Sequence, residues 1–203
     1  MTTTIFLTRH GQTDSNVTGF YMGWSDEDLN ETGNSQARHL SSRLSRLPIA
    51  SVYTSPLRRA YTTATILAEP HGLEPKVLDD LIEIQLGDWQ GLHRDEIQRK
   101  WPELWQQSRI DPKDITMPNG ESFNEVTKRA IRAFETIVKA NQVKRAVLVT
   151  HEVIVKVLAA YVLGASNSIY RRFEVNNASF SVIRVANGSY QLATLNDTSH
   201  LAD

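Results

Sequence analysis

Three apolar, strand-like runs in this chain end in threonine and are followed at once by polar or cationic residues. Ile5-Phe6-Leu7 leads into Thr8-Arg9-His10, Ser51-Val52-Tyr53-Thr54 leads into Ser55-Pro56-Leu57-Arg58-Arg59, and Ala146-Val147-Leu148-Val149-Thr150 leads into His151. The carboxyl ends of parallel strands share one edge of an open sheet, and ligands bind at that edge. If the three strands are neighbours, Arg9, His10, Arg59 and His151 converge on one cleft. This concentration of cationic groups predicts a site for an anion.

Composition restricts the classes of protein that fit. The chain has 203 residues, no cysteine and a formal net charge of -1. The length predicts a single domain over 1-203, with a flap segment around 94-121. The near-zero charge gives no general attraction for nucleic acid or an anionic membrane, so any anion site is local. The absence of cysteine excludes disulfides, thiolate zinc sites and cysteine catalysis. Without a basic leader or a long apolar run, we expect a soluble, cytoplasmic protein.

Strand and helix patterns alternate along the chain. The pattern predicts helices near 31–47, 57–69, 94–106 and 123–140, and a further apolar helix from His151 to Gly164. Residues 11–31 are expected to form a long functional loop, and Asn187-Gly188 is typical of a hairpin turn. This order predicts a three-layer α/β/α sandwich with a mostly parallel central sheet and a C-terminal hairpin. Helices on both faces would account for central strands that are apolar without alternation.

Several motifs together resemble the histidine phosphatase (phosphoglycerate mutase-like) superfamily. They are Thr8-Arg9-His10-Gly11-Gln12-Thr13 with Asn16, Ser55-Pro56-Leu57-Arg58-Arg59-Ala60, Glu83 ahead of Gly87-Asp88-Trp89-Gln90-Gly91, and His151. Leu29-Asn30-Glu31-Thr32-Gly33, Gly120-Glu121-Ser122 and Leu195-Asn196-Asp197-Thr198 also resemble family segments, so the resemblance covers nearly the whole chain. It implies the phosphoglycerate mutase-like fold.

The resemblance also implies the role of each site residue. His10 would be the nucleophile that becomes phosphohistidine, and Glu83 would protonate the leaving oxygen and then activate water. Arg9, Arg59 and His151 would hold the phosphoryl oxygens, because a planar guanidinium fits phosphate bidentately. Further phosphate or substrate contacts are expected from Gln12, Asn16, Met22 and Gly23.

No cluster of Asp, Glu or His suggests a metal site, and we expect no cofactor. The expected partner is a small phosphorylated metabolite, with no nucleic acid and no membrane, and a homodimer is a candidate assembly.

Two features near the motifs have open roles. Many relatives carry a small residue after the second histidine, whereas this chain has Glu152. A carboxylate inside the pocket would repel phosphate, so we expect Glu152 to turn outward and leave its backbone N–H available. Trp24, Tyr21 and Met22 are expected either to contact substrate or to pack within the loop, and Trp89 to pack in the core.

The favoured function is a metal-independent phosphomonoesterase. A cofactor-dependent phosphoglycerate mutase is the alternative, but mutases carry an Arg and a Tyr shortly after the glutamate, and Ile84-Gln85-Leu86 stand here. A catalytically silent binding module is a further alternative, and it would ordinarily lack one of the catalytic residues that the resemblance implies. The segments around Leu81–Gly91 and Asn176–Ile183 most resemble metal-independent phosphoserine phosphatases, which makes phosphoserine, or another phosphate with a carboxylate, the first substrate to test. The resemblance has a gap at Leu86, where those enzymes carry a histidine.

Overall fold

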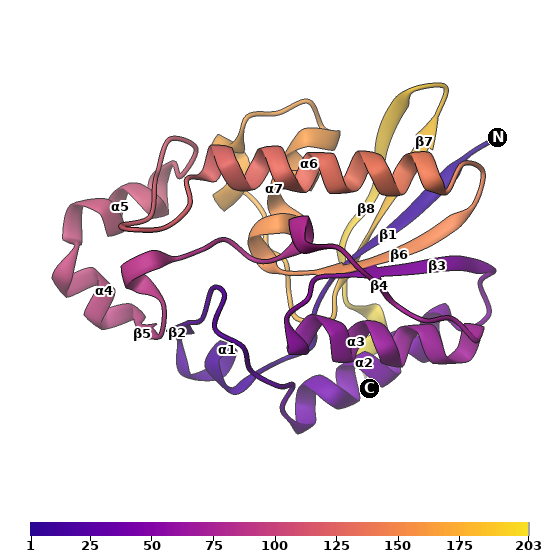
Figure 1. Ribbon diagram of the computed structural model, residues 1–203, viewed down its shortest axis with the longest axis horizontal. Helices are drawn as coiled ribbons and strands as arrows, with labels where there is room; N and C mark the ends of the chain where they lie inside the picture. The colour runs from indigo at the N-terminus through magenta and orange to yellow at the C-terminus, as the bar shows by residue number, and fades with distance from the viewer. Residues whose placement is uncertain (203) are drawn as a thin grey trace.

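The structure, a computed structural model, describes residues 1–202 and has a six-stranded mixed sheet at its centre (Figure 1). Its strands follow the order β4-β3-β6-β1-β7-β8, and β2 pairs with β5 in a separate ribbon. The strands are β1 Thr3–Arg9, β2 Phe20–Tyr21, β3 Ile49–Thr54, β4 Lys76–Val77, β5 Leu92–His93, β6 Arg145–Thr150, β7 Phe180–Ala186 and β8 Ser189–Asp197.

Helices cover both faces of this sheet. The α-helices are α1 Asp14–Thr18, α2 Glu31–Leu44, α3 Arg58–Ala68, α4 Arg94–Lys100, α5 Pro102–Ile110, α6 Phe123–Ala140 and α7 Glu152–Val162. Short 3-10 turns are η1 Glu69–His71, η2 Asp79–Leu81, η3 Gly87–Trp89, η4 Asn167–Arg171 and η5 Ser199–Leu201. The predicted caps are present: Asn30 accepts a hydrogen bond from the N–H of Gly33, and Ser122 with Glu125 forms a capping box.

The two faces of the sheet pack into two separate apolar clusters. Along β6, Ala146 and Leu148 belong to the cluster under α6 and α7, whereas Val147 and Val149 belong to the cluster under α2 and α3. In Figure 1, α6 and α7 lie on one side of the sheet and α2 and α3 on the other. Because both faces are covered, every one of these strand positions is apolar. The predicted three-layer sandwich is confirmed.

The three threonine-ended strands are adjacent, as predicted. Strand β6 pairs in parallel with β1 on one side and with β3 on the other, and β7 and β8 extend the sheet as an antiparallel hairpin. In the register, Thr150 lies opposite Arg9 and Val149 lies opposite Thr54. The residues that follow these strand ends therefore emerge at one edge of the sheet, beside the lobe formed by α1, α4 and α5 (Figure 1).

Two predicted segments differ from the structure. The expected helix over 94–106 is instead two helices, because Trp101 leaves helical geometry (φ -132, ψ 60) and Pro102 begins α5. The expected loop over 11–31 contains α1 and β2. Thr13 caps α1 in a box with Asn16, an arrangement that the usual Ser/Thr-x-x-Glu/Gln pattern does not detect.

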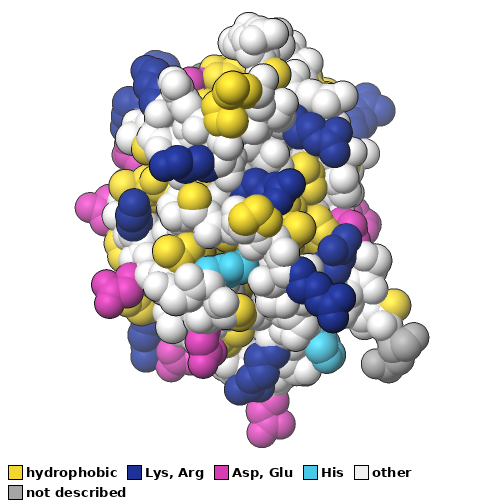
Figure 2. Space-filling view, turned by 90° about the vertical axis from the view of Figure 1, so that its right-hand side faces the viewer, with side chains coloured by type: hydrophobic (Ala, Val, Ile, Leu, Met, Phe, Trp, Pro, Cys, Tyr) yellow, Lys and Arg dark blue, Asp and Glu magenta, His cyan; other side chains and the backbone are white. Residues whose placement is uncertain are grey.

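At the far end of the molecule, around the amino ends of the strands, charged side chains are distributed differently from those at the predicted site. Figure 2 shows basic side chains spread over this face among uncharged and acidic ones. The concentrated charge of the predicted site lies at the opposite end of the sheet. Across residues 1–202, no helix has both the length and the apolar character needed to span a membrane.

Candidate active site

The backbone at the end of β1 fixes the position of His10. Its N–H donates to the carbonyl of Thr150 at 2.9 Å, and its carbonyl accepts from the N–H of Ala178 at 3.0 Å. Gly11 comes next, and a Cβ there would lie 2.5 Å from the carbonyl oxygen of Gly33, so only glycine permits this approach to α2. The imidazole is thus mounted on the sheet rather than on a free loop.

One hydrogen bond determines the tautomer of the His10 ring. Nδ1 lies 2.7 Å from the carbonyl oxygen of Gly11. A carbonyl can only accept, so Nδ1 carries the proton and Nε2 keeps its lone pair. Burial, followed by the charges of Arg59 and Arg9, holds the pKa of His10 well below its ordinary value. The ring is therefore neutral near pH 7, with a nucleophilic nitrogen.

Two arginines supply positive charge beside this ring. Arg59, only 3% exposed, donates from Nη1 to the carbonyl of Ser25 at 2.9 Å and from Nη2 to that of Gly23 at 2.7 Å. Arg9 donates from Nη1 to the carbonyl of Val175 at 2.6 Å. Its Nε is buried without a partner among residues 1–202. Carbonyl contacts leave the guanidinium charge of Arg59 uncancelled, whereas Arg9 also lies 3.1 Å from a carboxylate oxygen of Glu152.

His151 lies behind His10 and not on the open surface of the site. The two ring centroids are 5.1 Å apart, and His151 is fully buried. Its Nε2 lies 2.7 Å from the hydroxyl oxygen of Ser55, which follows β3. Burial and the charges of Arg59, His10 and Arg9 hold the pKa of His151 well below its ordinary value. Its Nδ1 has no partner within residues 1–202.

Glu83 lies within the same site and is partly buried. Oε1 accepts from the N–H of Ile84 at 2.9 Å, and Oε2 lies 3.4 Å from the N–H of Val153. Burial raises the pKa of Glu83, and this effect exceeds the opposing effects of the two backbone N–H groups and Arg59. The raised pKa extends the pH range over which this carboxyl group keeps a proton that it can donate.

A buried ion pair holds the turn that carries Glu83. Arg129 donates to the backbone carbonyls of Asp80, Ile82 and Glu83 at 3.0, 2.5 and 2.8 Å. The same guanidinium binds both carboxylate oxygens of Glu121, at 2.7 and 2.8 Å. Glu121 also accepts from the N–H of Gln85 at 2.9 Å. The Gly120-Glu121-Ser122 segment therefore supports the Glu83 turn through Arg129 of α6.

Glu152 does not turn outward, so that expectation is wrong. Its Oε2 lies 3.1 Å from Nη1 of Arg9, its Oε1 lies 2.9 Å from Nζ of Lys156, and the residue lines the cavity. Although burial opposes ionisation, Arg9 and Lys156 hold the pKa of Glu152 below its ordinary value. The two cations neutralise the carboxylate, and this is the physical reason that it remains at the cavity wall.

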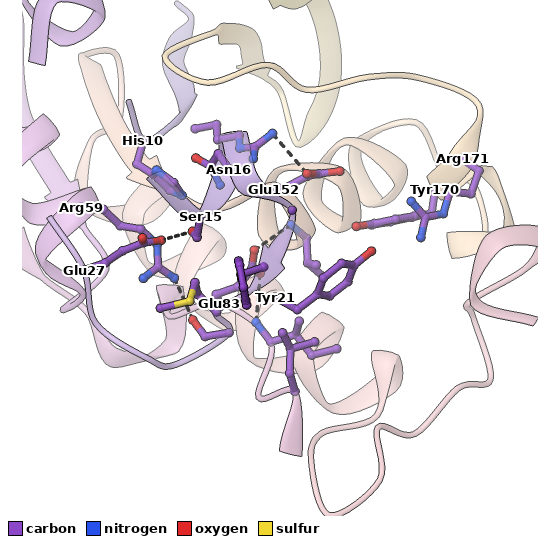
Figure 3. A pocket seen from close by; sticks show the side chains of 18 residues that line it. His10, Ser15, Asn16, Tyr21, Glu27, Arg59, Glu83, Glu152, Tyr170 and Arg171 are labelled. Carbon is purple, nitrogen blue, oxygen red and sulfur yellow. Dashed lines mark hydrogen bonds and ion pairs between the residues drawn. The ribbon is translucent and has the colours of Figure 1, made fainter. Parts of the chain in front are cut away.

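The site residues surround a cavity of about 260 Å³ (Figure 3). In Figure 3, His10, Arg59, Ser15 and Asn16 gather toward one end, Tyr170 and Arg171 lie at the other, and Glu83, Glu152 and Tyr21 lie between. The lining residues are Arg9, His10, Ser15, Asn16, Gly19, Phe20, Tyr21, Met22, Gly23, Glu27, Arg59, Glu83, Ile84, Leu86, Glu152, Val153, Tyr170 and Arg171.

Most of the remaining predicted contacts also reach this cavity. Asn16, Met22 and Gly23 line it. The side-chain oxygen of Asn16 accepts from Asn177 at 2.8 Å and from the N–H of Thr13 at 3.2 Å, which leaves its amide N–H group as a donor. Gln12 is not part of the lining, because its side-chain oxygen accepts from Asn30 at 3.1 Å.

The aromatic residues divide between mouth and core. Tyr21 lines the cavity, whereas Trp89 is 1% exposed and packs against Trp101 and Trp105. Trp24 does not line the cavity; its indole N–H donates to the backbone carbonyl of Glu83 at 2.5 Å.

Sequence reasoning gave no role to several residues of the site. Ser15 donates to Glu27 at the wall of the cavity, and Tyr170 and Arg171 close its far end. None of these belongs to a strand-end motif. Arg129 did carry a signal, since it is a charged residue beside the apolar positions Val126, Ala130 and Ala133 of α6.

Comparison with known proteins supplies independent information. The family model described as histidine phosphatase superfamily (branch 1) matches residues 5–198. A curated relative from Hydrogenobacter thermophilus, phosphoserine phosphatase 1, is 34% identical over 98% of this chain and 94% of its own length. A metal-independent phosphoserine phosphatase of Arabidopsis thaliana is 33% identical over 98% of this chain and 84% of its own. The solved structure of Bacillus stearothermophilus YhfR aligns with a TM-score of 0.94 at 33% identity, covering 98% of this chain and all 100% of that one.

Some relatives are longer than this chain. It spans 55% of a bifunctional protein of Mycobacterium tuberculosis, to which it is 34% identical over 98% of its own length.

Proposed function

The chain belongs to the histidine phosphatase superfamily and is a phosphatase, and from that premise we propose that it hydrolyses a small phosphate monoester through a phosphohistidine at His10. The candidate substrate carries a carboxylate near the phosphate, and L-phosphoserine is the first to test. Two relatives with that activity in their names support the choice.

In the first step, Nε2 of His10 attacks phosphorus and the bond from phosphorus to the ester oxygen breaks. Nδ1 keeps its proton on the Gly11 carbonyl throughout, so the attacking nitrogen needs no deprotonation. The equatorial oxygens remain charged during transfer, and catalysis therefore depends on fixed positive charge. Arg9, Arg59 and the amide of Asn16 lie at that end of the cavity. His151 packs edge-on against the His10 ring, and its own Nε2 lies beside the Ser55 hydroxyl, so it holds the orientation of the nucleophile.

In the same step, Glu83 gives its proton to the leaving oxygen and becomes a carboxylate. It then takes a proton from the water that attacks the phosphohistidine, which releases inorganic phosphate and restores both residues. The raised pKa of Glu83 supports the first half of this cycle, and the backbone N–H groups of Ile84 and Val153 support the second.

One observation carries the proposal. A neutral imidazole with a free Nε2 and a carboxyl group whose pKa is raised share one cavity with two arginines. This combination provides a nucleophile, an acid and an anion site together. The catalytic residues that the resemblance implies are all present, which argues against a catalytically silent binding module; they are Arg9, His10, Arg59, Glu83 and His151.

Hydrolysis is favoured over mutase chemistry. After Glu83, the cavity wall continues with Ile84 and Leu86, which are apolar. The resemblance places an arginine and a tyrosine shortly after the glutamate in mutases, and this chain has neither there.

The test measures kcat/KM for L-phosphoserine, 3-phosphoglycerate, a sugar phosphate and p-nitrophenyl phosphate side by side. We expect the two carboxylate-bearing metabolites to be preferred over the sugar phosphate. If the sugar phosphate clearly wins over both, the substrate class is wrong while the phosphatase activity stands.

A further inference from the structure

Three charged side chains at the cavity have no part in phosphoryl transfer, and one of them, Glu27, accepts a hydrogen bond from Ser15. Glu152 lies between the phosphate end and the far end, and Arg171 lies at the far end beside Tyr170 (Figure 3). Leu86, at the position where the phosphoserine enzymes carry a histidine, is apolar and 6% exposed. Any recognition of a polar group on the substrate must therefore come from other residues of the wall.

Glu152 is held at the wall as a charged group. Lys156, with 6% of its side chain exposed, anchors Oε1 at 2.9 Å, and its Nζ lies 4.5 Å from the centre of the Tyr170 ring. The Glu152 side chain is 32% exposed, and its other oxygen faces Arg9. Since Lys156 is enclosed by protein, its pairing with Glu152 is costly to break. The carboxylate is thus fixed at the cavity.

Phosphate binding changes the charge balance around Glu152. A phosphate dianion at His10 draws on the positive charge of Arg9, which also neutralises Glu152 in the empty site. The Glu152 carboxylate then has Lys156 as its remaining ion-pair partner. Coulomb's law makes a second anion unfavourable beside it and a cation favourable. An ammonium group separated from the ester oxygen by two carbons would restore the balance.

Arg171 offers the complementary charge. Its Nε donates to the carbonyl of Ser108 at 3.2 Å, and its guanidinium carbon lies 4.9 Å from the centre of the Tyr170 ring. Within residues 1–202, neither terminal nitrogen of Arg171 has a protein acceptor. A guanidinium that is stacked and held by one nitrogen has its other edge free for a carboxylate.

We propose that Glu152 and Arg171 form a subsite for a zwitterion, so that the enzyme selects the phosphate ester of an amino acid. The ammonium group of the substrate binds the Glu152 carboxylate, and its carboxylate binds Arg171. This proposal rests on the proposed phosphatase function and specifies the substrate within it. It also assigns to Glu152 and Arg171 the polar recognition that Leu86 cannot provide.

Four substrates test the Glu152 contact and the Arg171 contact of the subsite separately. L-Phosphoserine has both charges, O-phosphoethanolamine has the ammonium alone, 3-phosphoglycerate has the carboxylate alone, and p-nitrophenyl phosphate has neither. The variants are Glu152→Gln, which keeps the shape of the side chain, and Arg171→Gln. Glu174→Gln is the control, because Glu174 is an exposed carboxylate of the same segment that does not line the cavity.

For Glu152→Gln, we expect the ratio of kcat/KM for phosphoserine to that for 3-phosphoglycerate to fall by about tenfold or more, as loss of one charged contact implies. The ratio for phosphoethanolamine to p-nitrophenyl phosphate should fall with it. Arg171→Gln should instead lower kcat/KM for the two carboxylate-bearing substrates relative to kcat/KM for the other two. Ratios are used because any general effect of Glu152 on Arg9 cancels. Glu174→Gln should leave all ratios unchanged.

Unchanged ratios in an active Glu152→Gln enzyme would overturn the subsite while the proposed function stands. If Glu152→Gln does not fold, unchanged ratios in Arg171→Gln would overturn it instead. A wild-type enzyme that hydrolyses none of the four phosphates would contradict the proposed function itself, and the subsite with it.

Discussion

At the scale of single residues, the proton on Glu83 controls the dependence on leaving group. An alkoxide needs that proton to depart, whereas nitrophenolate does not. Glu83→Gln should therefore slow the hydrolysis of phosphoserine by ~10²–10⁴ fold and that of p-nitrophenyl phosphate far less. Values of kcat/KM on both substrates check this, because kcat/KM reports the first transfer and excludes the later attack of water, in which Glu83 acts for both substrates. Equal losses on the two would mean that Glu83 only positions the substrate.

The pKa shifts of the same residues predict a pH profile. Glu83 must be protonated, and burial raises its pKa; His10 must be neutral, and burial with the charges of Arg59 and Arg9 lowers its pKa. Activity on phosphoserine should therefore decline as pH rises through the pKa of Glu83. On p-nitrophenyl phosphate this alkaline decline should be absent from kcat/KM. The same decline on both substrates would assign it to another group.

At the scale of elements, Gly87 joins the Glu83 turn to the flap segment. Its φ is +53°, and a Cβ would lie 2.0 Å from the carbonyl oxygen of Pro118. Gly91 has φ +76° with nothing within 4 Å of a Cβ. Both alanine variants incur the left-handed backbone cost of about 1–2 kcal/mol. Gly87→Ala should lower the free energy of unfolding, measured in urea, clearly more than Gly91→Ala does, and it should raise KM. Equal losses of unfolding free energy would show that the close contact has no role.

The ion pair between Glu121 and Arg129 belongs to the same scale. Removing one partner leaves a buried charge, so Arg129→Met should cost about 3–5 kcal/mol of unfolding free energy. The double variant Glu121→Leu with Arg129→Met should be closer to wild type. Arg132→Met is the control, because its pair with Asp80 is exposed and should cost less than about 1 kcal/mol. A double variant as unstable as the sum of the two single ones would contradict this account.

Sequence patterns predicted most elements because their signals are local. Threonine-ended apolar runs, the caps at Asn30 and Ser122, and the Asn187-Gly188 turn depend on neighbours in the chain. The site residues could be predicted to converge because parallel strands share one edge. The side chain of Glu152 could not be placed, since its orientation depends on Lys156 one turn later and on Arg9 at the end of another strand. The support of the Glu83 turn by Arg129 likewise joins segments more than forty residues apart.

At the scale of the whole molecule, positive charge from arginines should make ligand binding independent of metal. Residues 1–202 contain no group of three or more His, Asp or Glu side chains placed to hold a metal ion. Orthovanadate at 100 times its Kd should stabilise the fold by about 2.7 kcal/mol, which raises Tm by roughly 5–10 °C in a chain of this size. Treating the enzyme with excess EDTA, and removing the EDTA before vanadate is added, should change neither that rise nor the activity. Activity lost with EDTA and restored by Mg²⁺ or Zn²⁺ would reveal a metal site.

The covalent intermediate tests the central claim most directly. Wild-type enzyme is mixed with ³²P-labelled phosphoserine, quenched within milliseconds, digested and mapped by mass spectrometry. The account predicts an acid-labile, base-stable phosphoryl group on His10, formed and lost at rates consistent with turnover, and no label on His10→Ala. A His10→Ala enzyme that turns over at near the wild-type rate, or stable label on another residue, would contradict it.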